Sequence, residues 1–362
     1  MVNLPIEYCS KPVTPFGGMS LMKRFIDQVG IREKLSALPL PQPRSNDGYA
    51  PEQIVESFWL SIWTGASRYV HCDWLRYDQV LQSIFGWDYM PSQSTYSRFF
   101  GKFSQKLNTE LFPELQRWFF DQLTMGSITI DFDSTVITRY GDQQGSAKGY
   151  NPNKRGRNSH HPLMAFVSQT RMVANAWLRP GNTAASSSCR EFMEETFKEA
   201  LKHQQVGLVR ADSGFYTEDI MSYLETQRLN YIIAVRMYPN VKQVWNIYNS
   251  RADCENRIKE LKNDFGLENF CLQDFWATEA SFRFIMVAYN LMSLFRHFAL
   301  NHHKKATLST LKAYCFALGA WTVNHANKRV LKISLPTRKR AWMDGIFANI
   351  HNASPPFEYA NE

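Results

Sequence analysis

Between residues 127 and 262 the chain alternates short strand-like runs with helix-like segments, and this order restricts the fold more than any other feature. Three runs rich in β-branched and aromatic residues come first, and a segment with serine cap candidates and early acidic residues follows them. In chain order the segments are SITIDFDST, LMAFVSQT, MVANAWLRPG, SSSCREFMEETFKEALKH, GLVRADSGF, EDIMSYLETQ, YIIAVRM and YNSRADCENRIKELK. The order β-β-β-α-β-α-β-α predicts an α/β fold, with a mixed sheet flanked by helices.

The regions on either side of this core read as helical, so we expect three domains, at residues 1–120, 121–265 and 266–362. In the first region, Pro91 and Ser92 predict a helix start, and Thr95, Arg98 and Lys102 follow at one-face spacing. Such a helix suits DNA, or it is a surface helix with a polar side. The last region ends in basic runs, KKATLSTLKAY and NKRVLKISLPTRKRAW, which are more often a solvated face than a phosphate-binding surface.

Composition excludes several classes of protein. A hydrophobic content of 44% with 20% charged residues is typical of a soluble globular protein, and the net charge of +8 favours a polyanionic partner only modestly. The six cysteines show neither a C-x-x-C pair nor zinc-ligand spacing, which indicates reduced thiols in a cytosolic protein. The N-terminus lacks a secretory signal, and the most apolar run, FRFIMVAYNLMSLF, is too short and too charged to cross a bilayer. We therefore expect an intracellular protein with no membrane partner.

Two predicted strands end in carboxylates, Asp133 in IDFDST and Asp212 in RADSGF, and Glu255 lies in the last predicted helix of the core. Asp131 shares the strand face of Asp133 because side chains alternate along a strand. Carboxylates at the ends of neighbouring strands, joined by one from a packed helix, can hold two Mg²⁺ ions for a phosphoryl displacement. Each acid taken singly is more simply a cap or an ion-pair partner, but the three positions together favour a metal site.

The helix predicted around Glu255 carries a charged stripe. At about 100° per residue, Tyr248, Arg251, Glu255 and Lys262 fall within roughly 60° of one another, and Lys259 extends the same face. One carboxylate among several cations suits a DNA strand whose phosphates lie on either side of a metal-bound bond. An exposed helix with weak Glu–Lys pairs is the simpler alternative, but it does not account for the tyrosine on the stripe.

A Gly-, Asn- and Pro-rich loop, GYNPNKRGR, follows the first strand and is basic. We expect it to line a DNA groove and to make binding salt-dependent, although a solvated hairpin tip would have the same composition. The adjacent His160 and His161 point opposite ways if they lie on a strand, so packing or phosphate contact is a better interpretation than metal binding. The cations of this loop and of the residue before it are Lys148, Lys154, Arg155 and Arg157.

These motifs together resemble the DDE transposases of bacterial insertion sequences. The resemblance rests on IDFDST, RADSGF and the Y-x2-R-x3-E-x6-K spacing (the YREK signature), and it runs from about Phe16 to about Phe298. A narrower group within these transposases is similar also in YGDQQGSAKGYNPNKRGRNSHHPL, LRPGNT, ENRIKELKNDFG and FWATEASFRFIMVAYNLMSLF.

The resemblance implies an RNase H-like core that cleaves DNA at transposon ends and transfers the freed 3′-OH to target DNA. It implies a dimer on the terminal repeats, two Mg²⁺ ions with Mn²⁺ able to substitute, and a bacterial cytoplasmic protein associated with the nucleoid. Its metal ligands would be Asp133, Asp212 and Glu255, with Asp133 preferred over Asp131 because it directly precedes Ser134. Tyr248, Arg251 and Lys262 would contact DNA, and the N-terminal helices would bind ends or dimerise.

One departure from the family pattern concerns the connection before the last catalytic helix. Glu255 follows Asp212 by only 43 positions, so the usual β-rich insertion is missing, and Tyr238-Pro239-Asn240 reads as a turn there. That insertion helps to grip transposon ends, so the leading alternative is a catalytically impaired, transposase-derived DNA-binding protein. A structure-specific nuclease is weaker, because the YREK stripe matches transposases.

Overall fold

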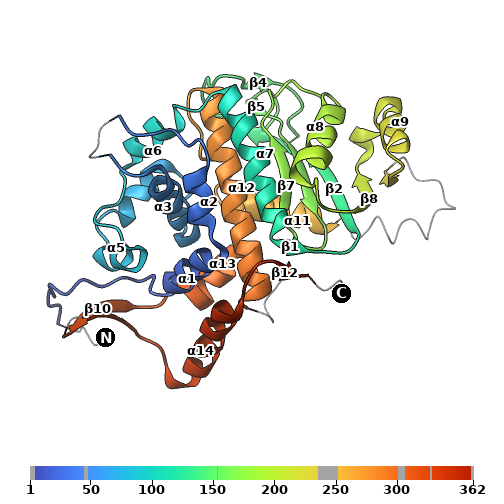
Figure 1. The fold of residues 1–362 in the computed structure, drawn as a ribbon. Helices are drawn as coiled ribbons and strands as arrows, with labels where there is room; N and C mark the ends of the chain where they lie inside the picture. The colour runs from blue at the N-terminus through green and yellow to red at the C-terminus, as the bar shows by residue number, and fades with distance from the viewer. Residues whose placement is uncertain are drawn as a thin grey trace.

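The fold is described by a computed structural model, in residues 5–44, 48–152, 154–234, 252–300, 306–326 and 328–359. Its N-terminal part is helical, as the apolar periodicity predicts, and α6 starts directly after its N-cap Ser92. The elements are α1 (Met19–Val29), α2 (Ile31–Ala37), α3 (Pro51–Thr64), α4 (Tyr69–Cys72), η1 (Asp73–Leu75), α5 (Gln79–Phe85), α6 (Gln93–Phe100) and α7 (Gln105–Asp121) (Figure 1).

The central sheet has five strands in the order β7-β6-β2-β8-β9. Strand β2 pairs in parallel with β8, and β8 with β9, whereas β6 is antiparallel to both β2 and β7. This mixed order, with helices on both faces, confirms the predicted RNase H-like α/β fold. The strands are β2 (Ile128–Ser134), β6 (Leu163–Val167), β7 (Val173–Trp177), β8 (Val206–Ala211) and β9 (Asn230–Ile233). The helical segments of the core are α8 (Cys189–Glu195), the π-helical turn η2 (Thr196–Ala200), η3 (Ser213–Phe215), α9 (Glu218–Thr226) and α11 (Ala252–Asn263).

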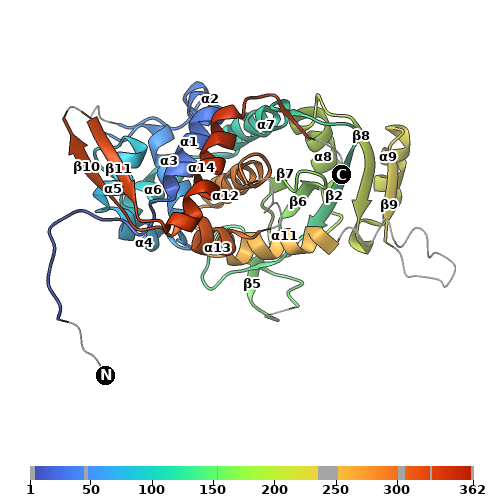
Figure 2. The same cartoon turned by 90° about the horizontal axis from the view of Figure 1, so that it is seen from below.

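The two faces of β2 have different partners. Phe132 packs against Phe192 of α8 and Phe197 of η2, with ring centroids 5.9 and 5.8 Å apart. The alternate residues, Asp131 and Asp133, point to the opposite face, because successive side chains of a strand alternate. Helix α11 lies on that opposite face, so one face of the sheet is apolar and the other carries the acidic residues (Figure 2).

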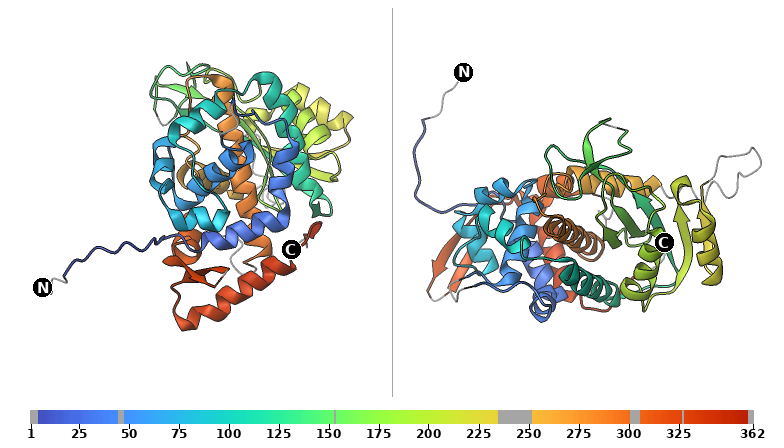
Figure 3. Two further views of the ribbon diagram at one scale, coloured as in Figure 1. Left: turned by 60° about the vertical axis from the view of Figure 1, so that its left-hand side comes forward. Right: turned by 90° about the horizontal axis from the view of Figure 1, so that it is seen from above.

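Helix α12 (Phe275–Phe298) joins the N-terminal helices to the sheet and is buried along most of its length (Figures 1 and 3). Trp59 of α3 donates through Nε1 to the carbonyl of Phe284 at 3.0 Å. On the opposite side, the Asn290 amide donates to the carbonyl of Val173 in β7 at 2.9 Å and accepts from its N–H at 2.8 Å. The central sheet and the N-terminal helices therefore share one hydrophobic core.

The segment after β2 forms a small three-stranded sheet in the order β3-β5-β4. Its strands are β3 (Ile137–Thr138), β4 (Ala147–Lys148) and β5 (Asn158–His160). The described part of the basic loop connects β4 to β5, as the strand-and-loop interpretation expected.

The C-terminal region is mainly helical, as predicted, but it also contains strands that were not predicted from the sequence, at Ala320–His325, Lys328–Ile333 and Phe357–Glu358. Val323 pairs with Val330 and Trp321 with Lys332 in an antiparallel hairpin, and Trp321, Thr322, Val323, Val330 and Ile333 are residue types that favour strands. The final strand, β12, adds in parallel to β1. The elements are β1 (Leu123–Thr124), α13 (Leu308–Leu311), the π-helical turn η4 (Lys312–Phe316), β10 (Ala320–His325), β11 (Lys328–Ile333), α14 (Thr337–Asn352) and β12 (Phe357–Glu358).

Two expectations from composition concern membranes and cysteines. Within the described ranges, no helix has both the length and the apolarity needed to cross a bilayer. All six cysteines lie in the described part of the chain and none is disulfide-bonded, which agrees with the prediction of free thiols.

Candidate active site

Asp133 and Asp212 lie side by side at one edge of the sheet. Phe132 of β2 is the register partner of Ala211 in β8, so the next residue of each parallel strand is an aspartate. Asp133 is buried and accepts a hydrogen bond from the N–H of Ser134 at 2.8 Å through Oδ1. Asp212 is half-buried and accepts from the N–H of Gly214 at 2.9 Å, which caps η3. The structure therefore brings together the two strand-end acids that the sequence indicated; we call this place the carboxylate edge.

Helix α11 packs directly on the carboxylate edge. The buried Cys254 thiol lies 3.8 Å from Oδ2 of Asp133. Glu255 follows in the first turn of the helix and is exposed. Tyr248 and Arg251 lie outside the described residues. Among the predicted triad, the structure thus places Glu255 on the helix that touches Asp133.

The donor chemistry of this edge suits Mg²⁺ because all three side chains offer hard carboxylate oxygens. In the described part of the chain, however, no group of three or more His, Cys, Asp or Glu side chains is gathered as a metal site. Two of the acids, Asp133 and Asp212, are neighbours by register, whereas Glu255 points toward solvent beside them. The three carboxylates are therefore suitable Mg²⁺ ligands by their chemistry. To complete the site, the Glu255 side chain would have to turn toward Asp133 and Asp212.

Asp131, the alternative first acid, has another partner. Its carboxylate is fully buried and accepts two hydrogen bonds from the Arg210 guanidinium, at 2.6 and 2.9 Å. Arg210 is its register partner on β8. A carboxylate committed to a buried guanidinium fork is poorly placed to bind a metal, so the geometry favours Asp133 over Asp131.

The two lysines of α11 have different surroundings. Lys262 donates through Nζ to the carbonyl of Val136 at 2.8 Å and pairs with Glu268 at 2.9 Å. Lys259 is exposed and lines an open pocket of about 400 Å³ together with Glu260 and Asn263 of the same helix. Lys262 therefore holds α11 against the chain that follows β2, whereas Lys259 faces solvent.

The basic loop forms part of a pocket of about 380 Å³ around Tyr140, which we call the Tyr140 pocket. Tyr140 is 70% exposed, and Lys154 and Arg157 lie over its ring at 4.8 and 5.9 Å. None of the four predicted cations of the loop forms an ion pair with a carboxylate among the described residues. The residues that line the pocket are Arg139, Tyr140, Gly141, Asp142, Lys148, Arg155, Gly156, Arg157 and Asn158.

The two histidines beside this loop are packing residues, in agreement with the sequence interpretation. His160 is buried, its Nδ1 accepts from Nε of Arg139 at 2.9 Å, and its Nε2 faces the carbonyl of Gln144 at 3.2 Å. Burial, reinforced by the charge of Arg139, lowers the pKa of His160 to about 4. His161 contacts the carbonyl of Thr183 at 2.8 Å, and burial lowers its pKa too. Both imidazoles are therefore neutral near pH 7.

Arg98 lies on α6 and lines a third pocket, of about 680 Å³. Helix α6 ends at Phe100, so Lys102 lies beyond the helix and not one turn further along it, as the spacing had suggested. Lys102 nevertheless lines the same pocket and donates to the carbonyl of Gln42 at 2.7 Å. Arg44, which the sequence did not single out, adds a third cation.

Sequence reasoning missed five residues around the carboxylate edge. Each forms part of one polar network that joins β2, β8, α11 and the β6–β7 turn. A signal was present: Asp131 and Arg210 are charged residues inside apolar strands, and each stands two positions before a predicted metal ligand. The missed residues are Ser168, Arg171, Arg210, Asp253 and Arg257.

Distant likenesses to solved structures include an integrase core and two transposases. The catalytic core domain of BIV integrase is 13% identical with a TM-score of 0.25, covering 45% of this chain and 83% of that one. A piggyBac transposase synaptic complex with hairpin DNA is 10% identical with a TM-score of 0.44, covering 85% and 82%. The Mos1 transposase paired-end complex with left transposon end is 11% identical with a TM-score of 0.23, covering 80% and 82%. At such scores none of them decides the fold or the function of this chain.

Comparison with families is decisive. No curated protein matches the chain. The family described as transposase DDE domain, group 1, matches residues 10–244 and 237–355, which together include the carboxylate edge, α11, the N-terminal helices and the C-terminal hairpin. With nearly the whole length matched, this chain belongs to the DDE transposase domain family.

Proposed function

We propose that this chain is an active transposase of a bacterial insertion sequence, cutting DNA at the ends of the element and joining the freed ends to a target. The observation that carries the proposal is the carboxylate edge. Asp133 and Asp212 end adjacent parallel strands, and Cys254 on α11 touches Asp133 beside Glu255. Sheet register and helix packing thus support one site built from three segments far apart in the sequence.

The proposed cofactor is a pair of Mg²⁺ ions, for which Mn²⁺ would substitute. Asp133 and Asp212 would supply oxygen ligands from the sheet, and Glu255 would supply the third from α11. Two such ions stabilise the negative charge on the attacking and leaving oxygens of an in-line displacement. The protein then needs no covalent nucleophile, and its part is to hold the DNA strand and the carboxylates in place.

The proposed reaction has two displacements at phosphorus. In the first, the oxygen of water forms a bond to phosphorus at the transposon end, the bond to the 3′ oxygen breaks, and a 3′-OH is released. In the second, that 3′-OH attacks a phosphodiester of the target, and a target 3′ oxygen leaves with the proton. Each step exchanges one P–O bond for another, so neither requires an external energy source.

DNA is the proposed partner, both as terminal repeats and as target, and the proposed setting is the bacterial nucleoid. The Tyr140 pocket offers unpaired, exposed cations to the phosphate backbone, and Arg98 and Lys259 offer two more. Lys262 is engaged within the protein, so its DNA contact would require it to exchange partners. The contacts of Tyr248 and Arg251, and a homodimer that pairs two ends, complete the proposal.

A second candidate function is a DNA-binding protein that occupies transposon ends without cutting them. The short connection between Asp212 and Glu255 favours it, because little chain is left there to hold a transposon end. The exposed position of Glu255 favours it as well.

The deciding experiment is a cleavage assay with Mg²⁺ on a supercoiled plasmid that carries the element's own ends, run beside Asp133→Asn. Cuts at the ends that vanish in the variant are the expected result. Binding of the ends by both proteins, with no cuts by either, would contradict catalysis and leave the end-binding function. Loss of binding in Asp133→Asn would instead mean that this acid supports the fold.

A further inference from the structure

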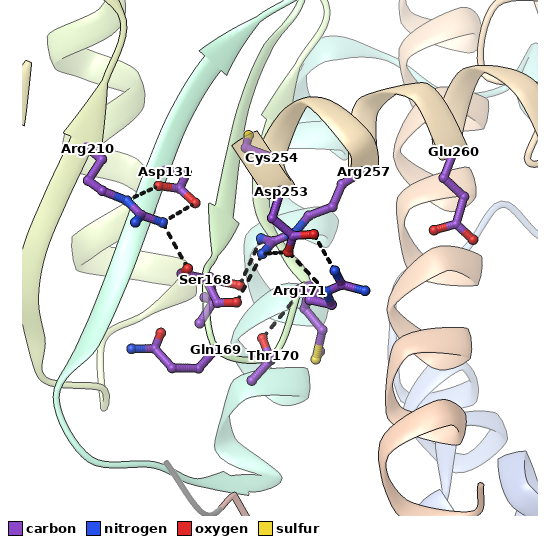
Figure 4. Close-up of polar contacts among 12 residues, drawn as sticks. Asp131, Ser168, Gln169, Thr170, Arg171, Arg210, Asp253, Cys254, Arg257 and Glu260 are labelled. Carbon is purple, nitrogen blue, oxygen red and sulfur yellow. Dashed lines mark hydrogen bonds and ion pairs between the residues drawn. The ribbon is translucent and has the colours of Figure 1, made fainter. Parts of the chain in front are cut away.

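Each of the three segments that carry a predicted metal ligand also carries a charged residue two positions from that ligand. Asp131 precedes Asp133 on β2, Arg210 precedes Asp212 on β8, and Asp253 and Arg257 flank Glu255 on α11. These four residues are joined, through the β6–β7 turn, into one continuous chain of hydrogen bonds (Figure 4). We call it the arginine network; its members are Asp131, Arg210, Ser168, Arg257, Asp253 and Arg171.

In the sheet, the network joins β2 to β8. The Arg210 fork meets the Asp131 carboxylate across the register pair, and both side chains are almost fully buried, at 3% and 0% exposure. A parallel strand that slips by one residue moves its side chains to the opposite face. The bidentate pair therefore opposes any slip that would separate Asp133 from Asp212.

On the helix, the network joins α11 to the β6–β7 turn. The buried Arg257 donates to the carbonyls of Val167 at 3.2 Å and Ser168 at 3.0 Å, and to the Asp253 carboxylate at 2.6 Å. Arg171, in the turn, also donates to Asp253, through Nε at 3.0 Å. The helix is thus fixed on both sides of Glu255, one turn of helix or less away.

Ser168 connects the two halves. Its hydroxyl lies 2.9 Å from Nη2 of Arg210, and its carbonyl accepts from Arg257. A displacement of α11 therefore disturbs the same residue that contacts the β2–β8 pair. Ser168 thus contacts both Arg210 and Arg257 and is the junction of the network.

Stability alone does not account for such a network. Buried ion pairs are often no more stabilising than apolar residues of the same volume, because desolvation offsets the Coulomb energy. What a guanidinium fork adds is direction, since its donors meet two acceptors in one plane. Metal ligands must be held in a fixed orientation. Mutation of the residues that orient them typically lowers metal affinity by about 10- to 100-fold.

We propose that the arginine network is a positioning device that sets the two strand-end aspartates and Glu255 at the mutual distances a divalent metal site requires. Its members act through the carboxylates and do not touch DNA or metal. The inference rests on the proposed function, because it assigns supporting residues to the same site.

The test compares Asp253→Asn and Ser168→Ala with the wild-type protein. Asp253→Asn removes the negative charge and one of the two carboxylate oxygens that accept from Arg171 and Arg257. Ser168→Ala removes only the hydroxyl at the junction. We expect the Mg²⁺ concentration for half-maximal plasmid cleavage to rise about tenfold in Asp253→Asn and less in Ser168→Ala. DNA affinity measured in EDTA should be unchanged in both.

A second readout does not depend on activity. Fe²⁺ with ascorbate generates hydroxyl radicals that cut the backbone near a bound ion, so the wild-type protein should be cut close to Asp133 and Asp212. In Asp253→Asn the same cuts should need about tenfold more Fe²⁺.

The matched control is Arg32→Gln in the N-terminal helices. Arg32 makes a comparable fork with the buried Glu56, through Nε at 2.8 Å, far from α11 along the chain. Its loss should lower the melting temperature and leave both metal responses as in the wild type. If Asp253→Asn and Ser168→Ala behave like this control, the network serves stability only and the proposal is wrong. A wild-type protein with no iron-directed cuts and no DNA cleavage would overturn the proposed function itself.

Discussion

The arginines beneath the carboxylate edge and the arginines of the Tyr140 pocket have opposite environments. Arg210 and Arg257 are each 3% exposed and hydrogen-bonded to carboxylates and carbonyls. Arg155 and Arg157 are exposed and, within the described residues, pair with no carboxylate. The same side chain thus serves two purposes. Where its partners are supplied by the protein it fixes geometry, and where they are not, its charge is available to a phosphate backbone.

The largest expected effect is the loss of DNA cleavage when Glu255, on the helix fixed by the buried Arg257, is neutralised. Glu255→Gln keeps the size of the side chain and removes its charge, so plasmid cleavage should fall at least about 10³-fold, because a metal site lowers the barrier by several kcal/mol. DNA binding, measured by filter retention, should be unchanged or tighter, since one carboxylate no longer faces phosphates. Loss of the fold or of binding would remove Glu255 from the metal site.

Arg257→Ala, in the buried network, should lower the free energy of unfolding much more than a substitution of an exposed arginine in the Tyr140 pocket. The substitution leaves the carbonyls of Val167 and Ser168 without their donor, whereas Asp253 keeps its pairing with Arg171. The loss of these hydrogen bonds from a charged group costs about 1.5–3 kcal/mol. Urea denaturation should show this loss in the free energy of unfolding. The corresponding change in the pocket, Arg157→Ala, should alter it by no more than about 0.5 kcal/mol. Equal losses in the two variants would abolish the distinction.

His160 sharpens the comparison because it supports Arg139, the buried arginine at the wall of the Tyr140 pocket. Its pKa is about 4 when folded, against about 6.5 in the unfolded chain. Between these values the unfolded chain binds a proton that the folded protein does not, so stability falls as the pH falls. The expected loss from pH 7.5 to pH 4.0 is about 3 kcal/mol.

Urea denaturation at the two pH values measures this loss. His160→Gln, whose amide can still accept from Arg139, should lose about 3 kcal/mol less than the wild type over the same range. A wild-type pH dependence in His160→Gln would mean that other groups carry it.

Substitutions in the Tyr140 pocket should have the smallest effect on the stability of the fold, but they should clearly weaken DNA binding. Neutralising Lys148, Arg155 and Arg157 together, each to Ala, removes up to three phosphate contacts. The slope of log K against log salt for DNA binding should then flatten by about 2.7, at about 0.9 for each contact. The melting temperature should remain near that of the wild type. An unchanged slope would mean that the pocket does not face the DNA backbone.

Much of the fold was predictable because its signals are local. The alternation of β-branched and aromatic residues in SITIDFDST and LMAFVSQT marks buried strands, and the Ser92 cap marks the start of α6. The hairpin at Ala320–Ile333 was missed because AWTVNH and KRVLKI show no regular alternation of apolar and polar residues and lie between helix-like segments. Periodicity decides such short segments poorly when they carry few fully buried residues.

For the candidate site, the sequence by itself determined which acids end the strands and which helix carries Glu255. It did so because an apolar strand that gives way to a carboxylate is visible along the chain. Only the tertiary structure decided that Asp131 pairs with Arg210, that Lys262 binds Val136, and that Ser168 joins the sheet to α11. The physical reason is distance in sequence: these partners lie 79, 126 and 89 positions apart, and only the sheet register and the packing of α11 bring them within hydrogen-bond reach.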